Sequence, residues 1–198
     1  MSAAILPASP AADSLRRKRF TRSEVDRMLE LGILDGQRCE LIEGELIDKM
    51  GQNPPHAQAI RNLFSWLIKF FAPGQLQMQL PVEVKPGDSD WSLPEPDLAV
   101  LAESGGEYGK RHPRGDEILL AVEVADTSLR QDLTTKRDLY ARASVGEYWV
   151  LDLQSRRLIV HRNPAQGEYR ETAILNEGDL VSCIGHPEQT IAVRELLP

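Results

Sequence analysis

The sequence predicts an α/β domain from three observations. The apolar run EILLAVEV at residues 117–124 is typical of a central strand that is buried on both faces. Apolar residues recur at helical spacing over 54–74. Turn signals separate three strand-like segments at 146–153, 156–162 and 168–175, which predict an antiparallel strand meander at the C-terminal end.

Length and composition indicate one domain with an N-terminal tail. The chain has 198 residues, of which 41% are hydrophobic and 27% charged, as in ordinary soluble proteins. No apolar run approaches the ~20 residues that a membrane span requires. The small, Pro-rich start does not match a secretory signal. We therefore expect a disordered tail at 1–18, a single domain at 19–198, and no membrane association.

Net charge and cysteine content indicate how the protein binds nucleic acid and in which compartment it is found. A formal charge of −7 argues against nonspecific coating of nucleic acid, because backbone binding depends on Lys and Arg. The acidic surface also disfavours tight binding of a lone chain to a duplex, so we expect a homodimer that pools two sites. Cys39 and Cys183 form no CxxC motif, and free thiols fit the cytoplasm.

The first half of the chain predicts a helix, a hairpin and a second helix. Thr21 followed by Glu24 is a capping-box pattern, and Gly32 ends the first helix. CELIEGELIDK, at 39–49, predicts a tight hairpin centred on Glu43-Gly44. The second helix begins at Pro54 and ends at Pro73-Gly74.

The next segment predicts two strands joined by a polar turn. Residues 75–84 alternate in polarity like a half-buried strand, and 85–92 form the turn. A short apolar strand then opens at Asp97, directly after a proline. The composition of 103–116 is typical of a mobile loop.

Glu123 is an unusual residue for the central strand. An ionised carboxylate is costly to bury without a charged partner, and a period of two places it on the face of Leu119 and Ala121. The following helix, 128–143, is capped by Ser128 and presents Lys136 on its apolar stripe, with Asp132 four residues earlier. Glu123 is therefore followed by a helix that directs an ammonium group toward the core.

Asp97 adds a second acid at the entrance to a neighbouring strand. Two carboxylates with a nearby lysine suit hydrolysis of a phosphodiester. Mg²⁺ prefers one or two carboxylates together with waters and substrate phosphate, and it acidifies a bound water. The lysine would orient the nucleophile or stabilise charge on the phosphorus oxygens.

Four motifs occur together in this chain: CELIEGEL, PEPDLAV, AVEVADTS and DLTTKRDLYARASVGEYWVLDL. In this combination they resemble the Uma2 family (DUF820), which is similar to the PD-(D/E)xK restriction-endonuclease superfamily. The resemblance covers roughly 19–198. It implies a restriction-endonuclease-like central mixed sheet flanked by helices, with Asp97 and Glu123 as metal ligands.

The chain departs from the superfamily pattern at one position. Ala125 stands two residues after Glu123, where a lysine is expected, and Lys136 from the following helix is the candidate replacement. Glu40 matches the acid of the family's hairpin and is a candidate third acid.

Each of these residues also has a simpler, structural interpretation. Glu123 could form a structural ion pair with Lys136, Asp97 could stabilise a turn, and Asp132 could be a surface partner of Lys136. His56 is expected to cap or pack at the start of its helix rather than to bind a ligand.

The function predicted from the sequence is a Mg²⁺- or Mn²⁺-dependent endonuclease acting on DNA. Its candidate catalytic residues are Glu40, Asp97, Glu123, Asp132 and Lys136. The alternative is a catalytically inactive protein of the same fold that acts as a binding or scaffold module.

Overall fold

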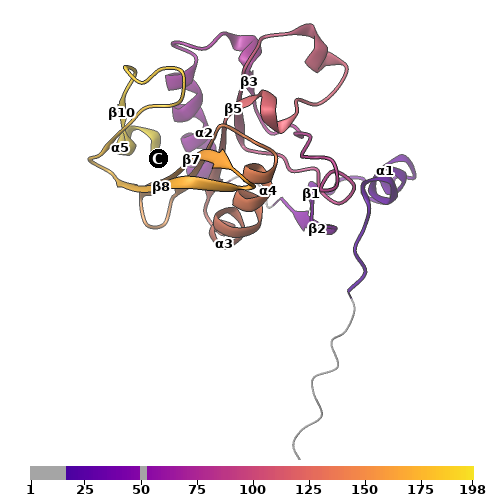
Figure 1. The fold of residues 1–198 in the computed structure, drawn as a ribbon. Helices are drawn as coiled ribbons and strands as arrows, with labels where there is room; N and C mark the ends of the chain where they lie inside the picture. Colours follow the sequence, from indigo (N-terminus) through magenta and orange to yellow (C-terminus); the bar gives the residue numbers. More distant parts are fainter. Residues whose placement is uncertain (1–16, 50–52) are drawn as a thin grey trace, which may run out of the picture.

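A computed structural model describes residues 17–49 and 53–198 (Figure 1). Most of the predicted tail, residues 1–16, lies outside the described residues. Arg17 and Lys18 are exposed and belong to no helix or strand. In the described part of the chain, no helix is both long enough and apolar enough to cross a membrane.

The centre of the fold is a six-stranded mixed β-sheet. Its order is β3-β4-β5-β6-β7-β8; β5 and β6 run parallel, and the other neighbours are antiparallel. The strands are β3 (Leu76–Gln77), β4 (Leu98–Leu101), β5 (Ile118–Ala125), β6 (Glu147–Asp152), β7 (Arg157–Ala165) and β8 (Glu168–Asn176). The sheet confirms the predicted α/β class, and β6 to β8 form the predicted antiparallel meander.

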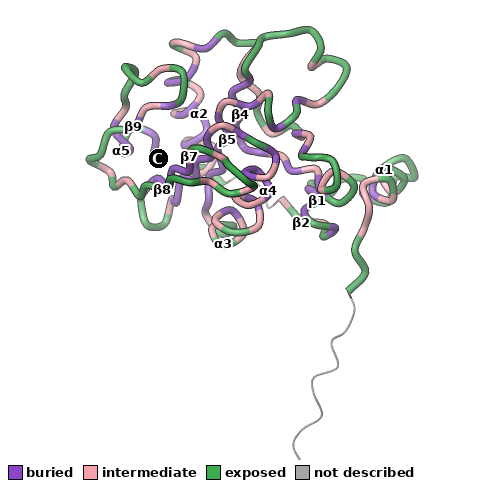
Figure 2. The backbone as a smooth tube through the Cα atoms, in the orientation of Figure 1, coloured by how far each residue is buried: buried purple, intermediate pink, exposed green. Residues whose placement is uncertain are grey.

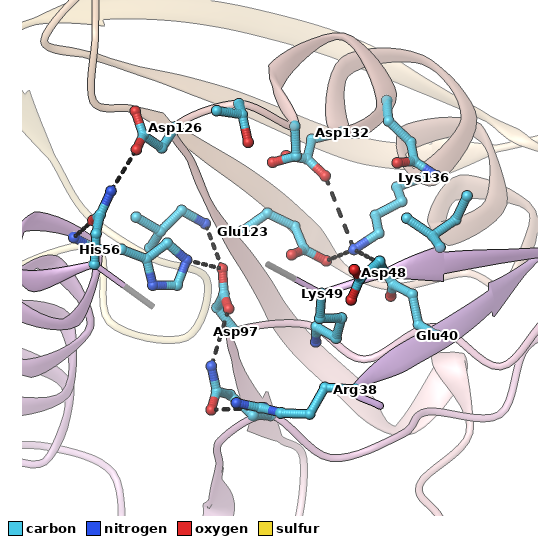
Figure 3. Close-up of a pocket in the computed structure, with 17 residues that line it drawn as sticks. Arg38, Glu40, Asp48, Lys49, His56, Asp97, Glu123, Asp126, Asp132 and Lys136 are labelled. Atoms are coloured by element: carbon cyan, nitrogen blue, oxygen red, sulfur yellow. Dashed lines mark hydrogen bonds and ion pairs between the residues drawn. The ribbon is translucent and has the colours of Figure 1, made fainter. Parts of the chain in front are cut away.

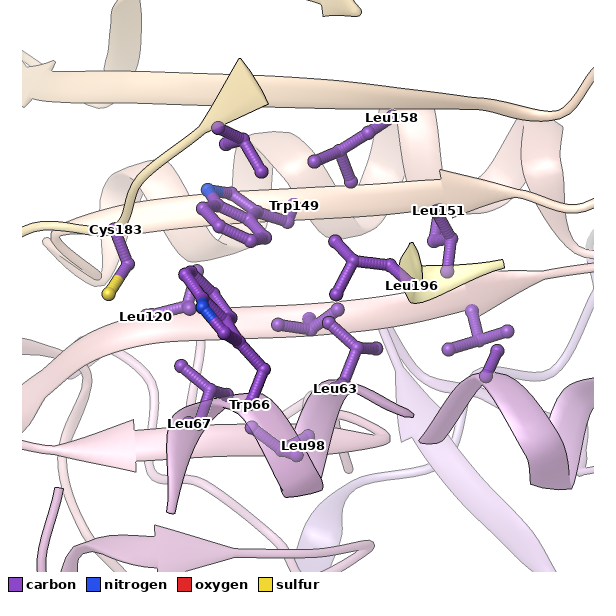
Figure 4. Packing of buried hydrophobic residues seen from close by; sticks show 14 of the residues in the cluster. Leu63, Trp66, Leu67, Leu98, Leu120, Trp149, Leu151, Leu158, Cys183 and Leu196 are labelled. Atoms are coloured by element: carbon purple, nitrogen blue, oxygen red, sulfur yellow. The ribbon is translucent and has the colours of Figure 1, made fainter. Parts of the chain in front are cut away.

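Helices cover both faces of this sheet because β5 and β6 are apolar on both sides. On one face, Leu63 and Leu67 of α2 (Pro54–Leu67) pack with Leu120 and Trp149, together with the short α5 (Val193–Leu196) (Figure 4). On the other face, Tyr140 of α4 (Arg137–Arg142) belongs to a second cluster. Figure 2 shows the buried residues concentrated along the sheet.

Outside the sheet, α1 (Arg22–Glu30) precedes a two-stranded hairpin of β1 (Cys39–Ile42) and β2 (Glu45–Asp48). The predicted capping box is present at Thr21 and Glu24. The hairpin turns at Glu43 (φ 49°) and Gly44 (φ 82°), and two positive φ values at the central residues define the tight turn that was predicted. A second small hairpin pairs β9 (Leu180–Val181) with β10 (Ile191–Ala192).

The prediction of a strand over 75–84 is confirmed only for Leu76–Gln77 and is wrong for the residues that follow. Only Leu76–Gln77 pair with β4, because Gln79 has a φ of 51° and Pro81 has no N–H to donate. The second predicted helix also ends earlier, at Leu67. The 103–116 loop contains a 3-10 turn at Gly106–Gly109, and a second such turn begins at Gly115.

Two details around Glu123 also differ from prediction. A β-bulge between Val100 and Leu101 changes the alternation of β5, so Leu119 packs with the cluster on the α2 side whereas Ala121 packs on the α4 side. The predicted 128–143 helix is α3 (Leu129–Gln131), a π-helical turn (Asp132–Lys136) and α4. Ser128 occupies the predicted N-cap position of α3, but its backbone angles are helical and its side chain makes no capping hydrogen bond.

Candidate active site

A cavity of about 140 Å³ opens where β4, β5, the β1–β2 hairpin and the starts of α2 and α3 meet (Figure 3). All five acidic and basic residues predicted for the site line it: Glu40, Asp97, Glu123, Asp132 and Lys136. They come from four segments of the chain, because Asp132 and Lys136 belong to the same helical turn. Each has an exposed fraction of 6% or less.

Lys136 is the partner of the buried Glu123. Its Nζ lies 3.0 Å from Glu123 Oε1 and 2.7 Å from Glu40 Oε1. The Tyr140 hydroxyl donates a second hydrogen bond to Glu123 Oε1, at 3.1 Å. Burial alone would lower the pKa of Lys136, but Glu123 and Glu40 outweigh it and the pKa is raised. Lys136 is therefore a charged ammonium.

Glu123 retains a second oxygen that faces a different direction. Oε2 accepts no hydrogen bond from any described residue, whereas Oε1 is held by Lys136 and Tyr140. Burial raises the pKa of Glu123, and the Lys136 ammonium opposes that shift. One oxygen is thus fixed by the protein, and the other is available to a ligand.

Asp97 lies immediately before β4 and is held as a carboxylate. Oδ2 accepts a hydrogen bond from the Val124 backbone N–H at 2.9 Å and lies 3.1 Å from His56 Nε2. Gln79 Nε2 donates to Oδ1 at 3.4 Å. Burial alone would raise the pKa of Asp97, but the bonds from His56 and Val124 lower it overall. These contacts replace the turn-stabilising role considered from the sequence.

Glu40 and Asp132 complete the acidic cluster. Glu40 Oε2 accepts a hydrogen bond from the Glu95 backbone N–H at 3.0 Å, so both of its oxygens are engaged. Asp132 Oδ1 lies 3.9 Å from Lys136 Nζ, and Oδ2 accepts a bond of 2.5 Å from Ser128. Burial raises the pKa of Asp132 to about 6. An exposed fraction of 1% rules out the surface role considered for Asp132.

Asp132 and Lys136 face the cavity from the two ends of a π-helical turn. A π-helical turn widens the helix by one residue and occurs frequently at functional sites. Here it spans Asp132–Lys136, so both ends of the turn are buried at the pocket. The sequence shows the i,i+4 spacing but has no signal for this distortion.

Several polar residues that line the cavity were not predicted from the sequence, among them His56, Gln79 and Lys49. The N-cap of α2 is Asn53, not His56, and the His56 ring instead contacts Asp97. Asn53 followed by two prolines is the available signal, because it fixes the helix start and places His56 in the first turn. Gln79 and Lys49 had no comparable signal, since only the folded chain brings them to the cavity.

The donor set fits a divalent cation of the magnesium type. Among residues 17–49 and 53–198, no three His, Cys, Asp or Glu side chains are grouped as a protein-only metal cage. Mg²⁺ rarely uses such a cage and is usually bound by one or two carboxylates plus waters and phosphate. Glu40, Glu123 and Asp132 contact the Lys136 ammonium, and Asp97, whose pKa is lowered, adds a separate carboxylate for a cation to balance.

Comparison with known proteins agrees with this site. The sequence matches the Uma2 family, described as "Putative restriction endonuclease", over residues 23–194. The chain belongs to the Uma2 family. All five predicted site residues fall within the matched range.

Among solved structures, a crystal structure of a putative nuclease belonging to DUF820 from Anabaena variabilis ATCC 29413 is similar to this Uma2 chain. The TM-score is 0.60 at 21% sequence identity, and the match covers 81% of this chain and 89% of that one. The likeness confirms the restriction-endonuclease-like fold. No curated protein matches the sequence.

Proposed function

We propose that this protein is a metal-dependent endonuclease that hydrolyses phosphodiester bonds in DNA. The observation that carries the proposal is the meeting of Asp97, Glu123 and Lys136 in one cavity with an excess of buried acid. A water oxygen bonds to phosphorus while one backbone phosphorus–oxygen bond breaks. The products are one strand end with a phosphate and one with a hydroxyl.

Asp97 and Glu123 would hold the metal, Mg²⁺ or Mn²⁺. A bound ion of this kind would screen the phosphate charge and lower the pKa of a water. Asp97 is suited to the role because His56 and Val124 keep it ionised and fixed. Glu123 is suited because Lys136 and Tyr140 fix one oxygen and leave the other available.

Lys136 has two roles in this proposal. Its ammonium positions Glu123, and its place in the cavity wall lets it stabilise charge on the phosphate or orient the attacking water. Glu40 and Asp132 are positioning residues, because they contact the ammonium. The superfamily lysine position is Ala125, so an ammonium from the next helix would replace the missing group.

The test combines cleavage with metal binding. Supercoiled and linear DNA are incubated with Mg²⁺ or Mn²⁺, and Mn²⁺ binding is measured by calorimetry. Asp97→Asn and Lys136→Met should each reduce cleavage by at least about 100-fold, the usual scale for a catalytic polar group. Asp97→Asn should also weaken Mn²⁺ binding, whereas Asp116→Asn, at a side chain 65% exposed, should change neither. Unchanged cleavage in both site variants would refute the assignment.

A scaffold function is the second candidate, and one observation favours it. Lys136 is 3% exposed and its ammonium already contacts Glu40 and Glu123, as in a structural ion pair. A scaffold would neither bind Mn²⁺ at millimolar concentration nor cleave any DNA form. RNA and branched DNA are included as substrates, so that a nuclease with a different substrate is not mistaken for a scaffold.

The proposed setting is a homodimer in the cytoplasm. The net charge of −7 supports pooling of two sites, because a single acidic chain binds a duplex weakly. Cys39 and Cys183 are free cysteines, as expected for a reducing compartment. Sedimentation equilibrium should give twice the mass of the chain, and a monomer at assay concentration would contradict the dimer.

A further inference from the structure

We propose that Arg38 and Lys49 form a phosphate clamp, which holds a second phosphate of the substrate beside the acidic cavity. The proposal rests on the proposed function and adds the substrate class. The preferred substrate is a polynucleotide with several phosphodiesters, and not a nucleotide or a small diester.

The hairpin register places the two cations opposite each other. Cys39 pairs with Asp48, and the Lys49 N–H donates to the Arg38 carbonyl at 2.7 Å, so Arg38 and Lys49 are the next facing pair. Residues directly opposite on antiparallel strands share a face, and like charges there are destabilising. Both residues line the cavity. The Glu95 carboxylate offsets part of the repulsion at Lys49, and an anion between the two cations would offset the remainder.

The Arg38 guanidinium has N–H groups that are available to bind such an anion. It is exposed, its side chain donates one hydrogen bond to Gln79 Oε1 at 3.4 Å, and it forms no ion pair with a carboxylate of the described residues. A guanidinium matches two phosphate oxygens with parallel N–H groups. Lys49 is held more firmly, since Nζ donates to the Glu95 backbone carbonyl at 2.7 Å and pairs with Glu95 Oε2 at 3.4 Å, and its side chain is 13% exposed.

Gln79 lies between Arg38 and Asp97. Its amide oxygen accepts from Arg38 and its amide nitrogen donates to Asp97, each at 3.4 Å (Figure 3). A whole amide group therefore lies between the guanidinium and the Asp97 carboxylate. Arg38 is therefore beside the acids and not among them, which places it for a phosphate next to the one being hydrolysed.

Arg61 provides a matched control for Arg38. It is also exposed and donates to a glutamine amide, Gln58 Oε1, at 2.8 Å, but it lies on α2 outside the cavity lining. Any effect specific to Arg38 must then come from its place at the cavity. Because both arginines are exposed, Arg38→Gln and Arg61→Gln should fold normally.

Binding of a short fluorescent DNA duplex in Ca²⁺ is measured by anisotropy over a series of salt concentrations. Arg38→Gln should weaken binding about 10-fold and reduce the slope of log Kd against log salt by about 0.9, the loss of one phosphate contact. Lys49→Gln should act in the same direction. Arg61→Gln should match the wild type. Equal slopes for Arg38→Gln and the wild type would overturn the clamp.

Cleavage kinetics separate this inference from the proposed function. Arg38→Gln should raise KM for DNA with little change in kcat, and it should leave hydrolysis of bis(p-nitrophenyl) phosphate, a single diester, unchanged. If the wild type and Arg38→Gln cleave DNA with the same KM, the clamp is disproved and the proposed nuclease function is unaffected. If the wild type cleaves no substrate, but Arg38→Gln still reduces the slope of log Kd against log salt, the clamp is supported and the nuclease function is disproved.

Discussion

The orientation of each acidic side chain in this site is fixed by the hydrogen bonds that it accepts. Asp97 accepts bonds from a backbone amide, a histidine and a glutamine, and Glu123 accepts from a lysine and a tyrosine. Such bonds fix the rotamers of both acids before a ligand arrives. Ligating groups that are oriented in advance bind metal more tightly, because less entropy is lost on binding.

His56 should control the affinity of Asp97 for metal. An ionised carboxylate only accepts hydrogen bonds, so His56 Nε2 must donate, and the buried Nδ1 has no partner among the described residues. His56→Ala removes the donor and should weaken Mn²⁺ binding about 10-fold, the scale reported for partners of metal ligands. His56→Gln, which keeps a donor, should recover part of the loss.

The matched control is His112→Ala, in the loop before β5, and calorimetry at constant pH is the readout. His112 does not line the cavity. Equal Mn²⁺ affinities for His56→Ala and His112→Ala would mean that the contact with Asp97 has no role in metal binding.

The site residues that could be predicted from the sequence break a local sequence pattern, and the site residues that could not be predicted do not. Glu123 and Lys136 could be predicted because a charge within an apolar strand or stripe breaks a local pattern. His56, Gln79 and Lys49 break no local pattern, and their role exists only because α2, the 78–84 segment and the hairpin converge. Tertiary convergence of this kind has no signal in a single sequence.

At the scale of elements, strongly periodic segments were predicted well and irregular ones poorly. The position and type of α2, β5 and the β6–β8 meander follow from apolar periodicity. The failures are β3, the π-helical turn and the bulge in β5, each of which depends on one or two residues departing from regular geometry. Two irregular regions contribute to the cavity wall: the π-helical turn through Asp132 and Lys136, and the segment after β3 through Gln79.

The contact between the 115–117 turn and the end of α4 should depend on a glycine. A Cβ added at Gly115 would lie 2.3 Å from the Ala143 carbonyl oxygen, so the turn or the helix end must move. Gly115→Ala should lower the free energy of unfolding by about 2 kcal/mol, the usual cost of overpacking. Chemical denaturation measures it.

Gly109→Ala is the control, because nothing lies within 4 Å of the position of its added Cβ. It also sits in a 3-10 turn of the same loop region. A Gly115→Ala protein as stable as Gly109→Ala would show that the helix end yields without cost.

For the whole molecule, most of the buried charged side chains gather at the cavity beside β4 and β5, whereas the cluster around α2 consists of hydrophobic side chains. The cluster around α2 contains Trp66 stacked on Trp149 with ring centroids 6.0 Å apart. The cluster around α4 continues instead into Tyr140, Tyr148 and His161. Stability of that second face therefore depends on a titratable ring as well as on apolar burial.

His161 should make the stability of the protein fall in mild acid. Burial, together with the charge of Arg137, lowers its pKa to about 4. Its ring stacks on Tyr148, Nδ1 lies 2.9 Å from Thr172 Oγ1, and the buried Nε2 has no partner among the described residues. The unfolded chain binds a proton near pH 6.5, and the native protein does not until about pH 4. The unfolded state is thus favoured increasingly as pH falls through this window.

The free energy of unfolding is compared at pH 7 and pH 4.5 for the wild type and His161→Phe, which keeps an aromatic ring against Tyr148. The histidine should contribute a loss of about 2 kcal/mol over this range. Carboxylates such as Asp132 also titrate there, but they are common to both proteins and cancel in the comparison. The wild type should therefore lose more stability than His161→Phe on acidification. Identical losses in the two proteins would show that His161 is already protonated in the native state or is exposed to water.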